Sequence, residues 1–267
     1  MIQSLRHPSV IPDFVPFSKP AAPPNLRRGL GAVFRRVLEG RTRVSVISLL
    51  AVIASHWFSS NFSVAMGLVF VLVIHELGHL VALSVLKMPA RWPVFIPFVG
   101  ALILFEKKPR NEIHEAWVGL GGPIAGLLAS LVLHLMAVKT GSPKLLMCAA
   151  AGYGLNLFNL IPLGESDGGH VAACVGRWLW IPGAIVHAGL LSLHSVFGWH
   201  LMFASGLFML SGMHRAWLWL DGRDTYADKQ PLASVSRWIV AGVYLLTVCG
   251  CGFGFRETLD QVLRAAR

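Results

Sequence analysis

Residues 63–86 read SVAMGLVFVLVIHELGHLVALSVL, an uninterrupted apolar run with His75-Glu76-Leu77-Gly78-His79 at its centre. A helix needs about 20 apolar residues to cross a hydrocarbon core of about 30 Å, so the run predicts a membrane-spanning helix. His75 and His79 are four residues apart, which places both imidazoles on one face of that helix, one turn from each other. Because ionisable side chains at membrane depth are costly, the run also predicts a functional site.

The motif His-Glu-x-x-His suggests a chemistry through its spacing. Two neutral imidazoles one turn apart can bind one Zn²⁺, and Glu76 beside them can take the proton of a water molecule. The alternative is that neighbouring helices simply satisfy these polar side chains. A third ligand elsewhere in the chain decides between the two interpretations.

The composition of the 267-residue chain is that of a membrane protein. Hydrophobic residues make up 55% of it and charged residues 13%, with a mean hydropathy of +0.62. Soluble domains carry roughly a quarter charged residues. The net charge of +10 comes from basic residues that flank apolar runs, which favours orientation in a lipid bilayer over nucleic-acid binding. The four cysteines lie in apolar segments and predict no disulfide framework.

Apolar segments along the chain predict an all-α polytopic membrane protein with about 6–7 transmembrane helices. Residues 1–43 are expected to form a basic, proline-rich cytosolic tail, residues 44–254 the integral membrane core, and residues 255–267 a C-terminal tail. The predicted spans are, in order, 44–58, 63–86, 114–138, 144–161, two within 178–210, and 238–253.

Residues 87–110 differ from the spans around them. They hold prolines and a glycine around the apolar stretch 94–105, which argues against a spanning helix. We expect a short β segment that dips into the membrane where the 63–86 helix ends, with an edge that can take an unwound peptide as an added strand. An interfacial loop packed on the helices is the alternative.

Lysine and arginine are unevenly divided between the two sides of this topology. With the N-terminus in the cytosol, 18 of the 23 fall on the cytosolic side and 5 on the other, as the positive-inside rule requires. We therefore expect a multi-pass protein of the cell (inner) membrane with a cytosolic N-terminus.

A second polar segment follows the predicted helix 144–161 and reads NLIPLGESDGGH from Asn159 to His170. Pro162 ends the helix, and a turn at Asp167-Gly168-Gly169 can aim the Asp167 carboxylate back among the helices. A catalytic zinc takes three protein ligands and keeps one position open. His75, His79 and Asp167 supply three. Glu165 is the alternative to Asp167, which is preferred because the glycine turn follows it directly.

The two motifs together resemble the site-2 protease family of intramembrane zinc metalloproteases. That family combines an intramembrane His-Glu-x-x-His with a later Asn-x-x-Pro-x-x-x-x-Asp-Gly segment, matched here by Asn159, Pro162, Asp167 and Gly168. The Gly-Gly-Pro at 121–123 and the β segment are similar to the family too, so the resemblance covers roughly residues 63–170.

The resemblance implies a zinc endopeptidase with one Zn²⁺ per chain, bound by His75, His79 and Asp167. Glu76 would activate water, and Asn159 would help to position the substrate backbone or the developing oxyanion. The expected partner is a membrane protein that is cut within or near a transmembrane segment, in regulated intramembrane proteolysis. His170 is expected either to support a metal ligand or to face the membrane interface.

Two other functions stay open. One is a zinc-binding membrane scaffold or assembly factor that does not hydrolyse peptides, against which Glu76 argues because binding alone needs no general base. The other is a transporter, whose polar groups would line a permeation path. Such a path would spread ionisable residues over several spans, whereas here they converge on two motifs.

Overall fold

The computed structural model of the chain describes residues 42–57, 62–89, 93–96, 100–102, 109–192, 199–223 and 234–265. Most of them are helical, in the order α2 (Thr42–Trp57), α3 (Phe62–Val85), α4 (Glu112–Thr140), α5 (Pro143–Asn159), α6 (Asp167–Val175), α7 (Trp180–Ser192), α9 (Trp199–Leu220) and α10 (Ser234–Ala265). Two short strands, β1 (Val94–Ile96) and β2 (Gly100–Leu102), lie between α3 and α4. The predicted tail 1–43 lies outside the described residues except for its last two positions.

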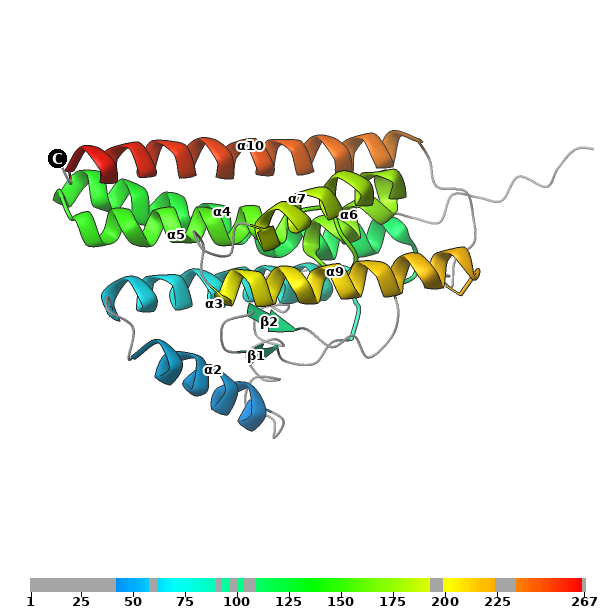
Figure 1. Cartoon of the computed structure of the whole chain (residues 1–267), viewed down its shortest axis with the longest axis horizontal. Coiled ribbons are helices and arrows are strands. Elements are labelled where there is room, and N and C mark those ends of the chain that lie inside the picture. The colour runs from blue at the N-terminus through cyan, green and yellow to red at the C-terminus, as the bar shows by residue number, and fades with distance from the viewer. Residues whose placement is uncertain are drawn as a thin grey trace, which may run out of the picture.

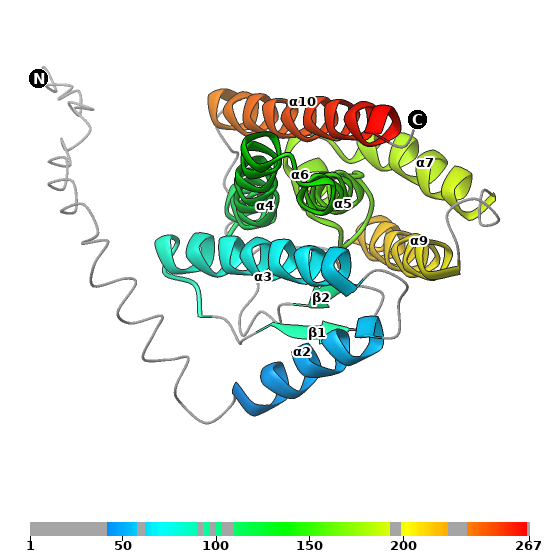
Figure 2. The ribbon, with the colours of Figure 1, turned by 90° about the vertical axis from the view of Figure 1, so that its left-hand side faces the viewer.

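The helices are arranged in layers, with α4 and α5 in the middle (Figure 1). α10 covers one side of this pair and α3 the other, and α6 packs against α4 and α10. α7 and α9 pack on each other, and the two strands lie between α3 and α2 (Figure 2). One face of α3 is therefore covered by α4 and α5, and His75 and His79 are buried on it.

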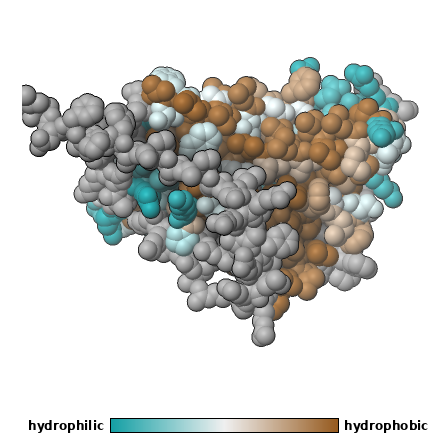
Figure 3. Space-filling view, turned by 180° about the vertical axis from the view of Figure 1, so that it is seen from behind, coloured by the Kyte–Doolittle hydropathy of each residue, from teal (hydrophilic) through white to brown (hydrophobic). Residues whose placement is uncertain are grey.

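Within the described part of the chain, three helices are long and apolar enough to cross a membrane, namely α3, α4 and α10. α2, α5 and α7 have 16, 17 and 13 residues, fewer than the roughly 20 that a span at right angles to the membrane needs. Seen from behind, an apolar band crosses the surface and hydrophilic side chains gather toward its sides (Figure 3). These features agree with a membrane protein.

β1 and β2 form an antiparallel hairpin within the stretch 94–105, the rest of which lies outside the described residues. The backbone N–H of Phe95 donates to the Ser48 hydroxyl of α2 at 3.0 Å. The Phe95 side chain packs in a cluster with three buried residues of α2 and α3, Val52, Val69 and Leu72. The hairpin is thus held between these two helices.

Two helices end later than the sequence predicts. α10 continues past residue 254 to Ala265, so most of the expected C-terminal tail 255–267 is helical. Its contacts explain the extension, because Phe255 packs on the cluster around Tyr153 and Thr258 is fully buried. α9 continues ten residues past the predicted limit at 210, to Leu220, and this extension carries the buried Arg215.

Candidate metal centre

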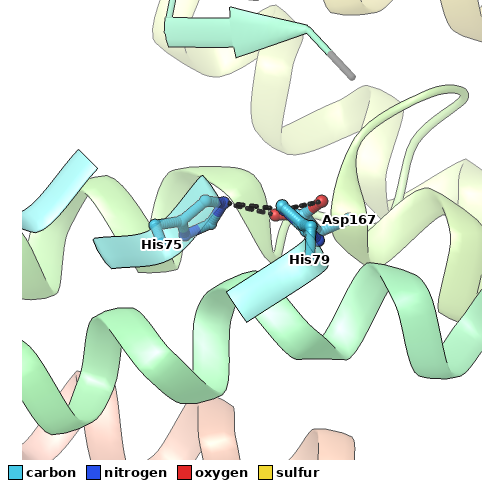
Figure 4. Close-up of side chains that lie close together, drawn as sticks. All are labelled: His75, His79 and Asp167. Carbon is cyan, nitrogen blue, oxygen red and sulfur yellow. Dashed lines mark hydrogen bonds and ion pairs between the residues drawn. The ribbon is translucent and has the colours of Figure 1, made fainter. Parts of the chain in front are cut away.

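The side chains of His75 and His79 of α3 meet that of Asp167, the first residue of α6 (Figure 4). The Nε2 atoms of the two histidines lie 3.1 Å apart. The Asp167 carboxylate lies 3.1 Å from Nε2 of His75 and 3.3 Å from Nε2 of His79. The histidines are buried and the Asp167 side chain is 12% exposed, so water has little access to the group.

The carbonyl oxygen of Val118 on α4 fixes the protonation of His79. This oxygen lies 2.7 Å from Nδ1 of His79, and because a carbonyl only accepts hydrogen bonds, Nδ1 carries the proton. The backbone N–H of Gly122 is farther from the same nitrogen, at 3.3 Å, and does not change this assignment. Nε2 is therefore the ring nitrogen of His79 that faces the other two side chains.

An asparagine of α5 fixes His75 in the same way. Nδ2 of the buried Asn156 donates to the Gly152 carbonyl at 2.7 Å, which turns Oδ1 toward Nδ1 of His75, 2.9 Å away. Because an amide oxygen only accepts, Nδ1 of His75 carries a proton, and Nε2 is the nitrogen that faces His79 and Asp167. Asn156 is not among the residues predicted from the sequence, although it lies one turn before Asn159.

Two imidazole nitrogens and a carboxylate thus face one another at one point. Oδ2 of Asp167 is buried and accepts no hydrogen bond from the described residues. Imidazole nitrogen and carboxylate oxygen are ligands of zinc, and atoms around a tetrahedral zinc ion lie about 3.3 Å apart. The two Nε2 atoms lie 3.1 Å apart, and each lies 3.1 or 3.3 Å from a different oxygen of Asp167. One ligand atom from each residue lies within 4.8 Å of the other two, so the three side chains can hold a metal ion.

α3 and α4 approach each other closely beside this group. A Cβ at Gly121 would lie 2.7 Å from the carbonyl oxygen of Gly78, and a Cβ at Gly78 would overlap the carbonyl oxygen of Gly121. Two glycines therefore let the helices cross backbone to backbone. This approach brings Val118 and Gly122 of α4 against the two imidazoles.

Gly122→Ala is expected to weaken metal binding by about tenfold or more, because its Cβ would overlap Nε2 of His79 and lie 2.7 Å from Nε2 of His75. The measurement is zinc retention by the purified protein against a competing chelator. Gly189→Ala on α7 is the control, since no atom of the described residues lies within 4 Å of a Cβ there. Equal retention in the two variants would contradict this geometry.

Asn156→Leu is expected to weaken zinc binding by about 10–100-fold, because His75 loses the acceptor that orients its ring. Asn159→Leu makes the same change one turn later and should keep the wild-type affinity. Nδ2 of Asn159 donates to the Leu155 carbonyl of its own helix at 3.1 Å. The affinity is measured by competition with a chromogenic chelator. Equal losses in both variants would show that α5 was disturbed as a whole, against a specific role of Asn156.

Ser166 holds Asp167 at the start of α6. Its hydroxyl accepts from the N–H of Gly169 at 2.9 Å and donates to the carbonyl of Ile161 at 2.5 Å. The turn predicted at Asp167-Gly168-Gly169 is therefore wrong: these residues form the first turn of a helix capped by Ser166. Serine is a favoured N-cap because its oxygen satisfies a free N–H of the first turn.

Glu165, the alternative third ligand, lies apart from the histidines. Its side chain is 56% exposed and lies 3.8 Å from Nε of Arg215. The group that can hold a metal contains Asp167 instead. The capped start of α6 turns Asp167 inward and leaves Glu165 on the surface.

Glu76 is buried beside the three candidate metal ligands, whereas the described hydrogen bond of Asn159 is to its own helix. Glu76 is 4% exposed, and its carboxylate lies within electrostatic range of both histidines and of Asp167. Asn159 is half-buried and bonds its own helix. The substrate-positioning role of Asn159 stays a prediction.

His170 contacts a carboxylate of α4. Its Nδ1 donates to Oε1 of Glu115 at 2.6 Å, and Nη2 of Arg215 donates to the same oxygen at 2.5 Å. The described contacts of His170 join α6 to α4 and α9, and its side chain is 12% exposed. Its two expected roles, support of a metal ligand or a place at the membrane interface, stay predictions. Glu115 and Arg215 are absent from the residues predicted from the sequence.

The described residues thus combine three converging ligand atoms, a buried carboxylate next to them and an apolar helix that carries most of the set. Such a set can bind a divalent cation and move a proton in a place screened from bulk water. A comparison of the chain with protein-family models gives no match, and a comparison with curated proteins gives none either.

Proposed function

We propose that the chain is an intramembrane zinc endopeptidase, similar to site-2 proteases, that hydrolyses a peptide bond within or near a transmembrane segment of another membrane protein. The observation that carries the proposal is the convergence of His75 and His79, on the apolar helix α3, with Asp167 of α6, at contacts of 3.1 to 3.3 Å. Glu76 on the same helix adds a base, which hydrolysis needs and metal binding alone does not.

His75, His79 and Asp167 would hold one Zn²⁺ per chain. Three protein ligands of these types leave one coordination position open, as in zinc hydrolases. When bound, zinc supplies Lewis-acid polarisation of a water molecule and of the scissile carbonyl. The Val118 carbonyl and the Asn156 amide hold the two imidazoles with Nε2 toward the ion.

Glu76 is the residue that moves the proton in this proposal. Its carboxylate accepts a proton from the attacking water as the new C–O bond forms, and donates it to the amide nitrogen as the C–N bond breaks. Burial of Glu76 at 4% exposure limits competing reactions with bulk water. Asn159 would orient the substrate backbone through its amide oxygen, because its Nδ2 donates to the Leu155 carbonyl.

A substrate helix must be unwound before its peptide bond can react, because helical carbonyls are hydrogen-bonded within the helix. We therefore expect substrates with low helix propensity near the cleaved bond. The β1–β2 hairpin packs between α2 and α3, and β2 contacts α3. In the proposal its edge takes the unwound peptide as an added strand.

The membrane arrangement belongs to the same proposal: about 6–7 spans, a β hairpin at membrane depth, and a cytosolic N-terminus in the cell (inner) membrane. A cluster of charged and aromatic residues at one end supports it. Arg237 and Arg177 lie 3.1 and 4.0 Å from Glu112 of α4, and Arg177 also lies over the ring of Trp219. Arginine is typical of the cytosolic side of a membrane, and tryptophan of the membrane interface on either side.

The experiment compares wild type with Glu76→Gln on membranes of source cells that lack the protein. New peptide termini are identified by mass spectrometry after zinc-loaded protein is added. We expect termini within or beside apolar segments with wild type only. Zinc-loaded wild type that produces no more termini than Glu76→Gln would favour the non-proteolytic scaffold. A folded wild type without metal would favour the transporter.

A further inference from the structure

A buried ionic network joins three helices beside the segment that carries Asp167. Oε1 of Glu115 on α4 accepts from Nη2 of Arg215 on α9 at 2.5 Å and from Nδ1 of His170 on α6 at 2.6 Å. The side chains of Glu115 and Arg215 are each 5% exposed. Nη1 of Arg215 donates to the Gly164 carbonyl at 3.2 Å. The network thus connects α4, α6, α9 and the loop before α6.

Its contacts with the chain fall on both sides of Asp167. Gly164 lies three residues before it and His170 three residues after it. α4 lies directly against this segment, since a Cβ at Gly119 would come within 2.9 Å of the Asp167 carbonyl oxygen and 3.0 Å of the His170 Cβ. The distance between Asp167 and α4 is therefore set by this packing and by the network.

The same helix also holds the histidines. The carbonyl of Val118, the residue before Gly119, orients His79, and Gly122, one turn after Gly119, makes room for both imidazoles. α4 thus contacts both the histidines of α3 and the segment of α6 that carries Asp167, and it fixes their positions relative to each other. A shift of the loop and α6 against α4 would change the spacing between Asp167 and the two Nε2 atoms.

The shape of arginine suits such a role. Its planar guanidinium reaches two acceptors in fixed directions, here Glu115 Oε1 and the Gly164 carbonyl. A buried ion pair often adds no stability over apolar residues of similar size, so stability alone is a weak reason for placing one here. Arg215 also lies over the ring of Trp180, 5.7 Å from its centre, which fixes the guanidinium further.

We propose that Arg215 is a positioning residue for Asp167: together with Glu115 and His170 it clamps the loop 163–166 and α6 against α4 and so sets the third metal ligand. The inference rests on the metal site of the proposed function. It goes beyond that proposal because it makes the metal affinity depend on α9, which contributes no ligand.

The test uses the full chain in detergent, with Co²⁺ as the probe because its visible spectrum reports the ligand geometry. Removing Arg215 alone would leave Glu115 charged and buried, which destabilises a protein. The main variant therefore combines Glu115→Gln with Arg215→Met, which removes both charges and keeps the volumes. Arg215→Lys is the second variant, because it keeps the charge but lacks the planar fork. Arg223→Met, at an arginine just past the end of α9 that pairs with Asp221 on the surface, is the control.

We expect the double variant to bind Co²⁺ about tenfold or more weakly than wild type, with a visible spectrum shifted toward that of Asp167→Asn. Thermal unfolding of the metal-free protein should stay near that of wild type. Arg215→Lys should show the same spectral shift in part, and Arg223→Met none.

Wild-type affinity and spectrum in a folded double variant, or in Arg215→Lys should the double variant not fold, would overturn the inference and leave the network a purely structural one. Failure of the proposed function is a separate result. In that case wild type itself binds no Co²⁺, or Asp167→Asn leaves the spectrum unchanged.

Discussion

Glu76→Gln is expected to lower the rate of peptide hydrolysis by about 10²–10⁴-fold, the usual contribution of a general base. Glutamine keeps the size of the side chain but cannot accept the proton of water. The metal should stay bound, because the ligand atoms belong to His75, His79 and Asp167. The rate of hydrolysis is measured on a substrate identified by mass spectrometry of new peptide termini, as described above. The zinc content of the same protein preparation is measured alongside.

Glu257→Gln is the matched control, since it makes the same change on the exposed surface of α10 and should keep both activity and zinc. Hydrolysis by Glu76→Gln at the wild-type rate would assign the base to another group. Loss of zinc together with activity would instead place Glu76 among the groups that hold the metal.

Asp167→Ala is expected to lower zinc affinity by more than about 100-fold, since even groups that only support metal ligands contribute about 10–100-fold. Hydrolysis should be lost with the metal. The carboxylate lies 3.1 and 3.3 Å from the two Nε2 atoms, and its removal leaves two ligands. The measurement is zinc affinity by chelator competition, with activity on the same samples.

Glu165→Ala is the matched comparison, two residues before Asp167 in the loop that leads into α6. Its carboxylate is 56% exposed and lies near Arg215, so zinc affinity should stay at the wild-type value. The reverse result, with zinc lost on changing Glu165 and kept on changing Asp167, would exchange the third ligand and contradict the geometry of the capped α6.

The histidine pair could be predicted from the sequence because its geometry is local. Four residues of helix fix the relation of His75 to His79, whatever surrounds them. Asp167 required a second motif far along the chain, and the structure places it within 3.3 Å of both. Its local structure was harder to predict. The two glycines after Asp167 suggested a turn, whereas the Ser166 hydroxyl caps a helix that includes them.

The contact between Asn156 and His75 could not be predicted from the sequence. Asn156 and Asn159 lie one turn apart on α5, and the rotation of that helix against α3 decides which of them meets His75. This rotation follows from packing with α4, where Gly126 leaves room for the amide of Asn156. A glycine of one helix opposite an asparagine of another is a signal that appears only once the two helices are paired.

The network of Glu115 and Arg215 could not be predicted from the sequence for a similar reason. The two residues are 100 positions apart in the chain, and Arg215 lies after residue 210, where the sequence predicts that the span ends. In the structure, α9 continues through Arg215 to Leu220 and brings that side chain inside. A buried charge at a helix end can be recognised only when its partner is known.

Zinc content of the purified wild-type protein, isolated without chelators in detergent, tests the central claim most directly. The double variant His75→Ala, His79→Ala measured alongside gives the background. Three ligands and one open position predict about one zinc per chain in wild type and none above background in the variant. A folded wild type that holds no zinc, even after dialysis against the metal, would contradict the account.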